Sequence, residues 1–158
     1  MKAYLAGPMR GYTLFNFQEF ESVNKYLVHT RGWEVTSPHE IDIQLSRVEY
    51  ECRIEWANSN PYRKFTKVKL KDGFDMQQAL REDFDEITSC DAIIMLKGWQ
   101  ESFGAVKELM VAAWSGLQTF QIYKDVLSMY AVMPLEVTES TLAHIHSAHC
   151  AGHTITVI

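Results

Sequence analysis

The first forty residues alternate between short apolar runs and one stretch with helical periodicity. Residues 2–6 form an apolar run ended by a Gly-Pro pair, which predicts a buried strand. From Asn16 to Gly32, apolar residues recur every three or four positions, which predicts a helix. Asn16 is its candidate N-cap, and Glu19 completes a capping-box pattern. Residues 33–36 predict a second strand, so the chain begins strand, helix, strand.

The middle of the chain is less regular. Apolar residues among charges favour a helix over residues 42–57, and the polar, basic residues 58–73 indicate an irregular, exposed excursion. Residues 74–90 are again helical in pattern. Residues 92–96 form the clearest strand, because they are continuously apolar, as in a parallel strand covered on both faces.

The last third predicts a helix over 104–114, a strand over 119–123, a helix over 138–148 and a strand over 154–158. Strands that alternate with helices imply an α/β fold with a doubly wound parallel sheet of about five strands and helices on both faces. Ligands of such sheets bind beyond the carboxyl ends of the strands. The loops after the first and the central strand are therefore the expected site.

Composition fits one globular domain spanning residues 1–158. Fifteen basic and twenty acidic residues give a net charge of −5, which argues against a protein that grips a nucleic acid polymer. A nucleotide as a small ligand stays possible, because one pocket can be positive on an acidic protein.

The few cysteines, the lack of a long apolar stretch and the early Gly-Pro pair lead us to expect a soluble, cytoplasmic protein. The three cysteines are Cys52, Cys90 and Cys150.

The loop after the central strand carries the best candidates for chemistry. Ser102 stands where an N-cap or an anion-binding hydroxyl would stand, and the backbone N–H groups after it favour an anion. Glu108 lies one turn further, where the positive helix end is expected to keep it ionised, and an ionised carboxylate can act as a nucleophile. The alternative is an ordinary cap followed by a solvated glutamate.

Three further residues are weaker candidates for the site. Asp83 lies near the edge of an apolar helical stripe, so it either points along the sheet top or belongs to the wet face of the helix. Arg10 in the first loop is a candidate anion contact. Tyr4 in the first strand would ordinarily be a core residue.

The tail contains several histidines, and His149 and His153 have a spacing that can hold zinc. Gly152 interrupts that helix, so surface or subunit-contact histidines are the alternative, and we expect no metal. The tail residues concerned are His144, His146, His149, Cys150 and His153.

Three segments in this order resemble the nucleoside 2-deoxyribosyltransferase superfamily, including its small phage and bacterial members and its deoxynucleoside 5′-monophosphate N-glycosidase branch. They are residues 4–11 (Tyr-Leu-Ala-Gly-Pro-Met-Arg-Gly), Asp83 with the later Asp91-Ala92-Ile93, and residues 102–108 (Ser-Phe-Gly-Ala-Val-Lys-Glu). The resemblance covers about residues 1–45 and 75–123. It implies a Rossmann-like, flavodoxin-like fold and no cofactor.

The resemblance also implies roles. Glu108 matches the nucleophile that attacks the anomeric carbon, and Asp83 matches the carboxylate that assists departure of the base. Tyr4 and Arg10 match residues that border the reacting centre, and Gly7 lets the backbone approach the ligand. Two carboxylates can divide the barrier of N-glycosidic cleavage, with water as acceptor for hydrolysis or a second base for transfer. The implied substrate-binding residues are Gly7, Pro8, Met9, Ser102 and Gly104.

Some positions depart from the family pattern. Pro8 stands where the N-glycosidase branch has a serine, Met110 stands where members often have glycine, and residues 46–73 match no family segment, although they can cover the base pocket. Met110 and the unmatched residues 46–73 favour a rival, a non-catalytic nucleotide-binding protein that keeps the fold. A zinc-binding interaction module built on the tail is a third hypothesis.

The resemblance carries two more expectations. The family commonly completes its site with a neighbour's residues, so we expect a homodimer or larger assembly, with Trp114 and the stretch 129–135 as contact area. Nucleoside-specific members have an aspartate six positions before the nucleophile, where this chain has Ser102. A hydroxyl there favours a 5′-monophosphate over a nucleoside.

Overall fold

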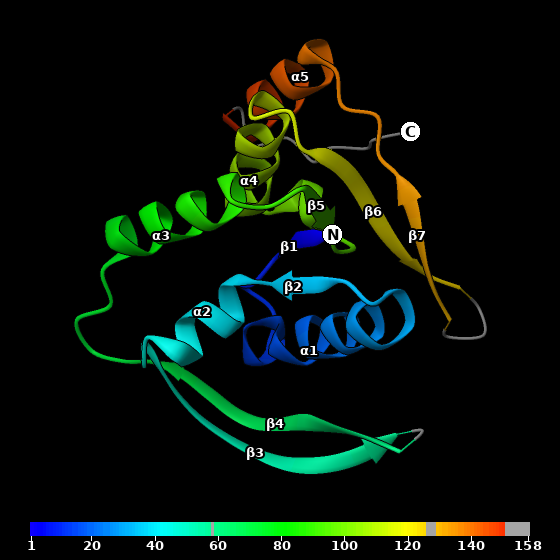
Figure 1. Cartoon of the computed structure of the whole chain (residues 1–158). Helices are drawn as coiled ribbons and strands as arrows, with labels where there is room; N and C mark the ends of the chain where they lie inside the picture. Colours follow the sequence, from blue (N-terminus) through cyan, green and yellow to red (C-terminus); the bar gives the residue numbers. More distant parts are fainter. Residues whose placement is uncertain (58, 126–128, 151–158) are drawn as a thin grey trace.

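A computed structural model of the chain describes residues 1–57, 59–125 and 129–150. Its centre is a five-stranded sheet in the order β2-β1-β5-β6-β7, in which the first four strands are parallel and β7 runs antiparallel to β6 (Figure 1). This is the 2-1-3-4-5 order of flavodoxin-like sheets, so the expected fold class is confirmed. The strands are β1 (Lys2–Ala6), β2 (Glu34–Thr36), β5 (Ala92–Met95), β6 (Gln118–Lys124) and β7 (Tyr130–Pro134).

Helices cover both faces of the sheet (Figure 1). Helix α1 (Phe17–Tyr26) packs on the face formed by Ala3, Leu5 and Ile94. Tyr4 and Ile93, which pair across β1 and β5, point to the opposite face. That face is covered by α3 (Met76–Thr88), α4 (Phe103–Trp114) and α5 (Glu139–Cys150).

Shorter elements complete the chain. Helix α2 (Pro38–Gln44) follows β2, and three single turns are η1 (Thr13–Asn16), η2 (Leu27–Arg31) and η3 (Trp99–Glu101). Among the described residues, no helix combines the length and the apolar character needed to cross a membrane.

The predicted helix over 42–57 is wrong beyond Gln44, and the predicted irregular excursion over 58–73 is mostly a strand. Strands β3 (Val48–Ala57) and β4 (Asn60–Leu70) pair as an antiparallel hairpin, which curves beneath α1 and α2 (Figure 1). The physical reason lies in β3, where every second residue is apolar and glutamates or Arg53 stand between. A period of two is the signature of a strand. The hairpin forms a sheet of its own.

The expected capping box before α1 is also absent. Asn16 occupies the N-cap position with a left-handed backbone, at φ 60°, and its side chain donates to the carbonyl of Pro8 at 2.9 Å. Glu19 instead accepts from the Tyr130 hydroxyl at 3.3 Å. Leu14 and Phe15 also have positive φ, so the chain enters the helix from a direction that a capping box does not allow.

The last third of the chain follows the sequence expectation in part. The predicted helix over 138–148 is confirmed as α5, whereas the predicted strand over 154–158 lies outside the described residues. The fifth strand of the sheet is β7, which the sequence pattern did not indicate.

Candidate active site

Tyr4, Asp83 and Glu108 meet on one face of the sheet, although they come from β1, α3 and α4. The Tyr4 hydroxyl donates to Glu108 Oε1 at 3.3 Å, and it also interacts with the Asp83 carboxylate. Because β1 and β5 flank the point where the strand order reverses, the cluster lies where doubly wound sheets place their ligands. The structure therefore brings together three of the four residues expected to be catalytic.

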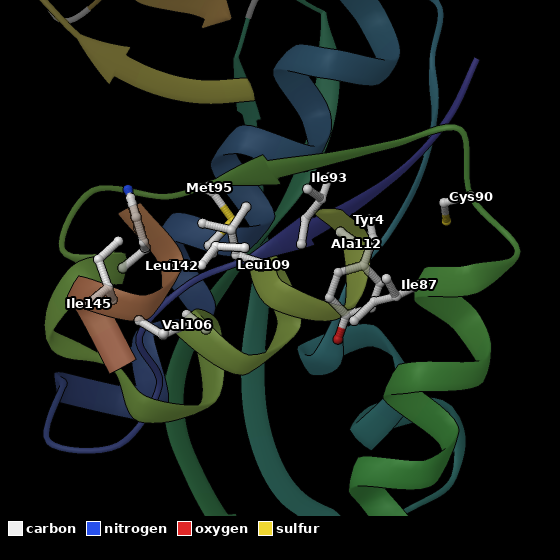
Figure 2. Close-up of a cluster of buried hydrophobic side chains, with 13 residues drawn as sticks. Tyr4, Ile87, Cys90, Ile93, Met95, Val106, Leu109, Ala112, Leu142 and Ile145 are labelled. Atoms are coloured by element: carbon white, nitrogen blue, oxygen red, sulfur yellow. The ribbon is translucent and has the colours of Figure 1, made fainter. Parts of the chain in front are cut away.

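Tyr4 belongs to both the core and the candidate site. Its ring is fully buried in the apolar cluster with Ile87 and Leu109, and Figure 2 shows its hydroxyl oxygen at the edge of the drawn side chains. Burial, together with the nearby charges of Glu108 and Asp83, raises the pKa of Tyr4 well above its usual value. The hydroxyl thus keeps its proton and remains a donor.

Glu108 lies in the second turn of α4 and is 7% exposed. Burial first, and repulsion from Asp83 second, raise the pKa of Glu108 to about 8, although the hydrogen bond from Tyr4 acts in the opposite direction. Burial therefore acts against the ionised form that the helix-end argument favours. Glu108 Oε2 is buried and has no hydrogen-bond partner among the described residues.

Asp83 lies half-buried in α3, next to this carboxyl group. Burial and the charge of Asp42 raise the pKa of Asp83 to about 6, against the effects of Tyr4 and Arg47. Both values are raised, so the two carboxyl groups titrate as a pair that holds about one proton at pH 7. Two carboxyl groups that share a proton are an arrangement typical of acid–base chemistry.

A polar network that the sequence did not reveal lies next to Asp83, and it contains Asp42, Arg47 and Glu82. Asp42 in α2 is buried and accepts from Arg47 Nη1 at 3.4 Å. Arg47 Nη2 donates to Glu82 Oε2, so the guanidinium joins α2 to α3. Burial raises the pKa of Asp42, although Arg47 lowers it. The sequence signal for this network was weak, because these residues are far apart and Asp42 fell inside a predicted helix of the wrong length.

The loop before α4 has the expected cap. Ser102 is the N-cap residue of α4, and its Oγ accepts from the Ala105 backbone N–H at 3.3 Å. Gly104 follows in the first turn, where an added Cβ would meet no described atom closer than Ser102 Oγ, at 4.0 Å. Ser102 thus stands at the helix end that the anion hypothesis requires.

The loop after β1 differs in detail from the family expectation. A Cβ on Gly7 would lie 2.7 Å from the Leu96 Cβ, so packing between the two strand ends requires this glycine. Pro8 is buried, and Met9 packs against the core beside α1. Arg10 is exposed and donates to Met76 Sδ at 3.7 Å, at the start of α3. The structure does not bring Arg10 to the carboxylates.

A second polar cluster lies under α1 and was also missed. The ligand atoms of Glu21, His39 and Glu40 lie within 4.8 Å of one another, a grouping that can hold a metal ion. Arg63 of β4 already supplies a cation there, because its guanidinium donates to Glu21 Oε2 at 2.6 Å and pairs with Glu40. Burial raises the pKa of Glu21, but His39 and Arg63 outweigh it and bring the pKa to about 2. The cluster fastens the hairpin to α1 and α2.

The cysteines and the tail histidines add little to the site. Cys52 and Cys90 are free thiols. His144 is exposed on α5, whereas the side chains of His146, His149 and Cys150 and all of His153 lie outside what the structure describes. The hypothesis of a zinc site in the tail, and the expectation that the tail holds no metal, therefore stay untested.

Comparisons with known proteins cover the region of the carboxylates. A family profile described as "Domain of unknown function (DUF4406)" matches residues 59–121, which is less than half of the chain and includes Asp83 and Glu108. Among solved structures, the Clostridium botulinum CMP N-glycosidase BcmB matches with a TM-score of 0.42 and 17% identity, over 77% of this chain and 70% of that one. None of the curated proteins matches the chain. A likeness of this size does not by itself assign an activity.

Proposed function

We propose that the protein cleaves the N-glycosidic bond of a deoxyribonucleoside or its 5′-monophosphate and passes the sugar to water or to a second base. The observation that carries this proposal is the cluster of Tyr4, Asp83 and Glu108, which joins two carboxyl groups through one buried hydroxyl at the switch point of the sheet. The motif resemblance supplies the reaction class, and the geometry supplies atoms that can perform it.

Glu108 Oε2 is the nucleophilic atom in this proposal. Tyr4 holds Oε1, so Oε2 is the carboxyl oxygen that remains for a substrate. Attack requires an ionised Glu108, whereas burial favours its protonated form. The productive form carries the same number of protons with the proton on Asp83, and the Tyr4 hydroxyl between the two groups provides a route for the exchange.

The reaction then balances in two steps. Glu108 Oε2 forms a bond to the anomeric carbon while the bond from that carbon to the base nitrogen breaks and Asp83 gives its proton to the leaving base. In the second step the Asp83 carboxylate takes a proton from water, the oxygen of that water bonds to the anomeric carbon, and Glu108 leaves as a carboxylate. A second base in place of water gives transfer.

The test is incubation with deoxynucleosides and their monophosphates, followed by chromatography of the released base. Glu108→Ala should reduce turnover at least ~10²-fold, the usual scale for a catalytic group. Glu101→Ala, an exposed glutamate in η3, is the matched control and should leave turnover unchanged. Asp83→Asn should slow poor leaving groups more than good ones.

Two results would contradict the proposal. Turnover near the wild-type rate in Glu108→Ala would exclude it as the nucleophile. Measurable nucleotide binding without release of any base would establish the rival, a non-catalytic nucleotide-binding protein. Met110, one source of that rival, packs against the apolar cluster that contains Tyr4, where it contributes to the core.

We also propose that a 5′-monophosphate is preferred over the nucleoside. Ser102 places a neutral hydroxyl at the N-terminus of α4, where the helix end favours a negative group and where an aspartate would repel one. Ser102→Asp should therefore reverse the preference. Titration of the wild-type protein with a deoxynucleoside and its monophosphate measures this directly, and equal or weaker binding of the monophosphate would exclude the phosphate site.

A further inference from the structure

A pocket of about 320 Å³ lies between the end of α2, the foot of the hairpin and the first half of α3. A cavity of this size accommodates a small heteroaromatic molecule. Its wall includes Arg47 and Glu82, which belong to the network behind Asp83. The residues around it that bear on its chemistry are Leu45, Ser46, Lys71, Asp72, Phe74 and Asp75.

The charges of this pocket disfavour a phosphate. Arg47 and Lys71 face three carboxylates, so the lining carries one net negative charge, and two of those carboxylates already pair with Arg47 or cap a helix. Asp75 is the N-cap of α3 and accepts from two backbone N–H groups, at 2.8 and 3.2 Å. A carboxylate thus occupies the place where a helix end would hold a phosphate.

The two helix ends at this edge of the sheet therefore differ in chemistry. Helix α3 is capped by the carboxylate of Asp75, whereas α4 is capped by the hydroxyl of Ser102. An anionic group is repelled at the first and accepted at the second. A ligand with one charged and one neutral end would place its neutral end in the pocket beside α3.

The lining suits a planar ring with an amino group. Phe74 and Leu45 supply apolar surface against which a ring can pack. Glu82 accepts from Gln78 at 2.9 Å and from Arg47, and each carboxylate oxygen keeps a lone pair for a further donor. A ring amino group provides such a donor, whereas a ring carbonyl in the same place would face negative charge.

We infer that this pocket binds the base of the substrate and prefers bases that carry an exocyclic amino group, a conclusion that rests on the proposed function. Arg47 connects the two parts of the site, because it bonds to Glu82 in the pocket wall and to Asp42 on the side of Asp83.

Free bases test the pocket without any turnover. In a nuclear magnetic resonance titration of the wild-type protein, cytosine and adenine should shift the amide signals of residues 45–47 and 71–78. Uracil and hypoxanthine, which carry a carbonyl in place of the amino group, should bind at least about tenfold more weakly. Shifts elsewhere only, or equal affinity within each pair, would overturn the inference.

Two variants sharpen this test. Glu82→Gln should reduce the preference for cytosine over uracil to less than about threefold, and Glu86→Gln, one turn along the same helix and paired with Lys2, should leave it unchanged. Phe74→Ala should weaken both bases together by about tenfold. Unchanged affinities in Phe74→Ala and an unchanged preference in Glu82→Gln would each count against the pocket.

Failure of the pocket and failure of the proposed function give different results. Binding of cytosine at the pocket without release of base from any nucleotide would support the pocket and contradict the glycosidase. Release of base with the same KM in wild type, Phe74→Ala and Glu82→Gln would support the glycosidase and overturn the pocket.

Discussion

Replacing Glu108 by glutamine should stabilise the protein while it removes activity. The glutamine has the same shape and its Oε1 can still accept from Tyr4, but it never carries a charge. In the native protein the Glu108 carboxyl resists ionisation because it is buried beside Asp83, and its pKa is about 8. In the unfolded chain the same group ionises near 4.5. Folding therefore holds a proton that the unfolded state releases.

The size of the effect follows from these two values. The unfolded state binds fewer protons between pH 4.5 and 8, so the free energy of unfolding falls as the pH rises through this window. One pKa unit corresponds to about 1.4 kcal/mol, which gives a cost of about 1 kcal/mol at pH 5, about 3 kcal/mol at pH 7 and about 4 kcal/mol at pH 8. These are upper bounds, because repulsion between Glu108 and Asp83 belongs to the pair.

Urea denaturation of the wild type and Glu108→Gln at these three pH values measures the effect. The difference in the free energy of unfolding should widen in favour of the variant as the pH rises. Glu101→Gln, at an exposed site, is the control and should follow the wild type at every pH. A difference that stays constant from pH 5 to 8, or a variant that is less stable at pH 8, would show that burial does not disfavour this charge.

Three further outcomes are expected. Arg63→Met leaves the buried carboxylate of Glu21 without its cation and should lower the free energy of unfolding by about 3 kcal/mol at pH 7. Lys67→Met on the same strand breaks only an exposed ion pair and should leave the free energy of unfolding unchanged. Equal effects of the two substitutions would contradict the role of Arg63 in fastening the hairpin. Gly7→Ala should lower the thermal midpoint of unfolding, because the added methyl group meets Leu96 at an overpacking cost of about 1–3 kcal/mol. Gly104→Ala has room for the methyl group and should not lower the midpoint. Similar midpoints for the two variants would refute the close contact between Gly7 and Leu96. Light scattering should give the mass of at least a dimer. The Trp114 side chain is 72% exposed, and Trp114→Ser should shift the protein toward the monomer. A mass of 18 kDa at micromolar concentration would exclude the dimer.

The sheet could be predicted from the sequence because its central strand is covered on both faces. Residues 92–95 are all apolar and all buried, so their pattern has one structural solution. Ser102 could be recognised as a cap because capping is a local interaction. Local pattern marked Asp83 and Glu108 as candidates, but only the motif resemblance linked them, since their contact through Tyr4 joins residues that are far apart in the chain.

The hairpin and the two polar networks could not be predicted in the same way. Val48, Cys52 and Trp56 fit helical spacing as well as strand alternation, and the choice between them depends on β4, which pairs with them. Arg63 and Arg47 each bond to residues of other elements, and a single sequence contains no signal for such partners. The raised pKa of Glu108 depends on burial, which a helix-end argument leaves out.

The hairpin leaves and re-enters the α/β unit at one place, because Val48 at the start of β3 pairs with Leu70 at the end of β4. An insertion whose two ends are neighbours imposes little strain on the chain around it. A hairpin of another length or composition can stand there without a change in the strand order of the central sheet. At this junction, residues 71–75 can thus change without altering Tyr4 or Glu108, whereas Arg47 cannot, because it also bonds to Asp42 beside Asp83.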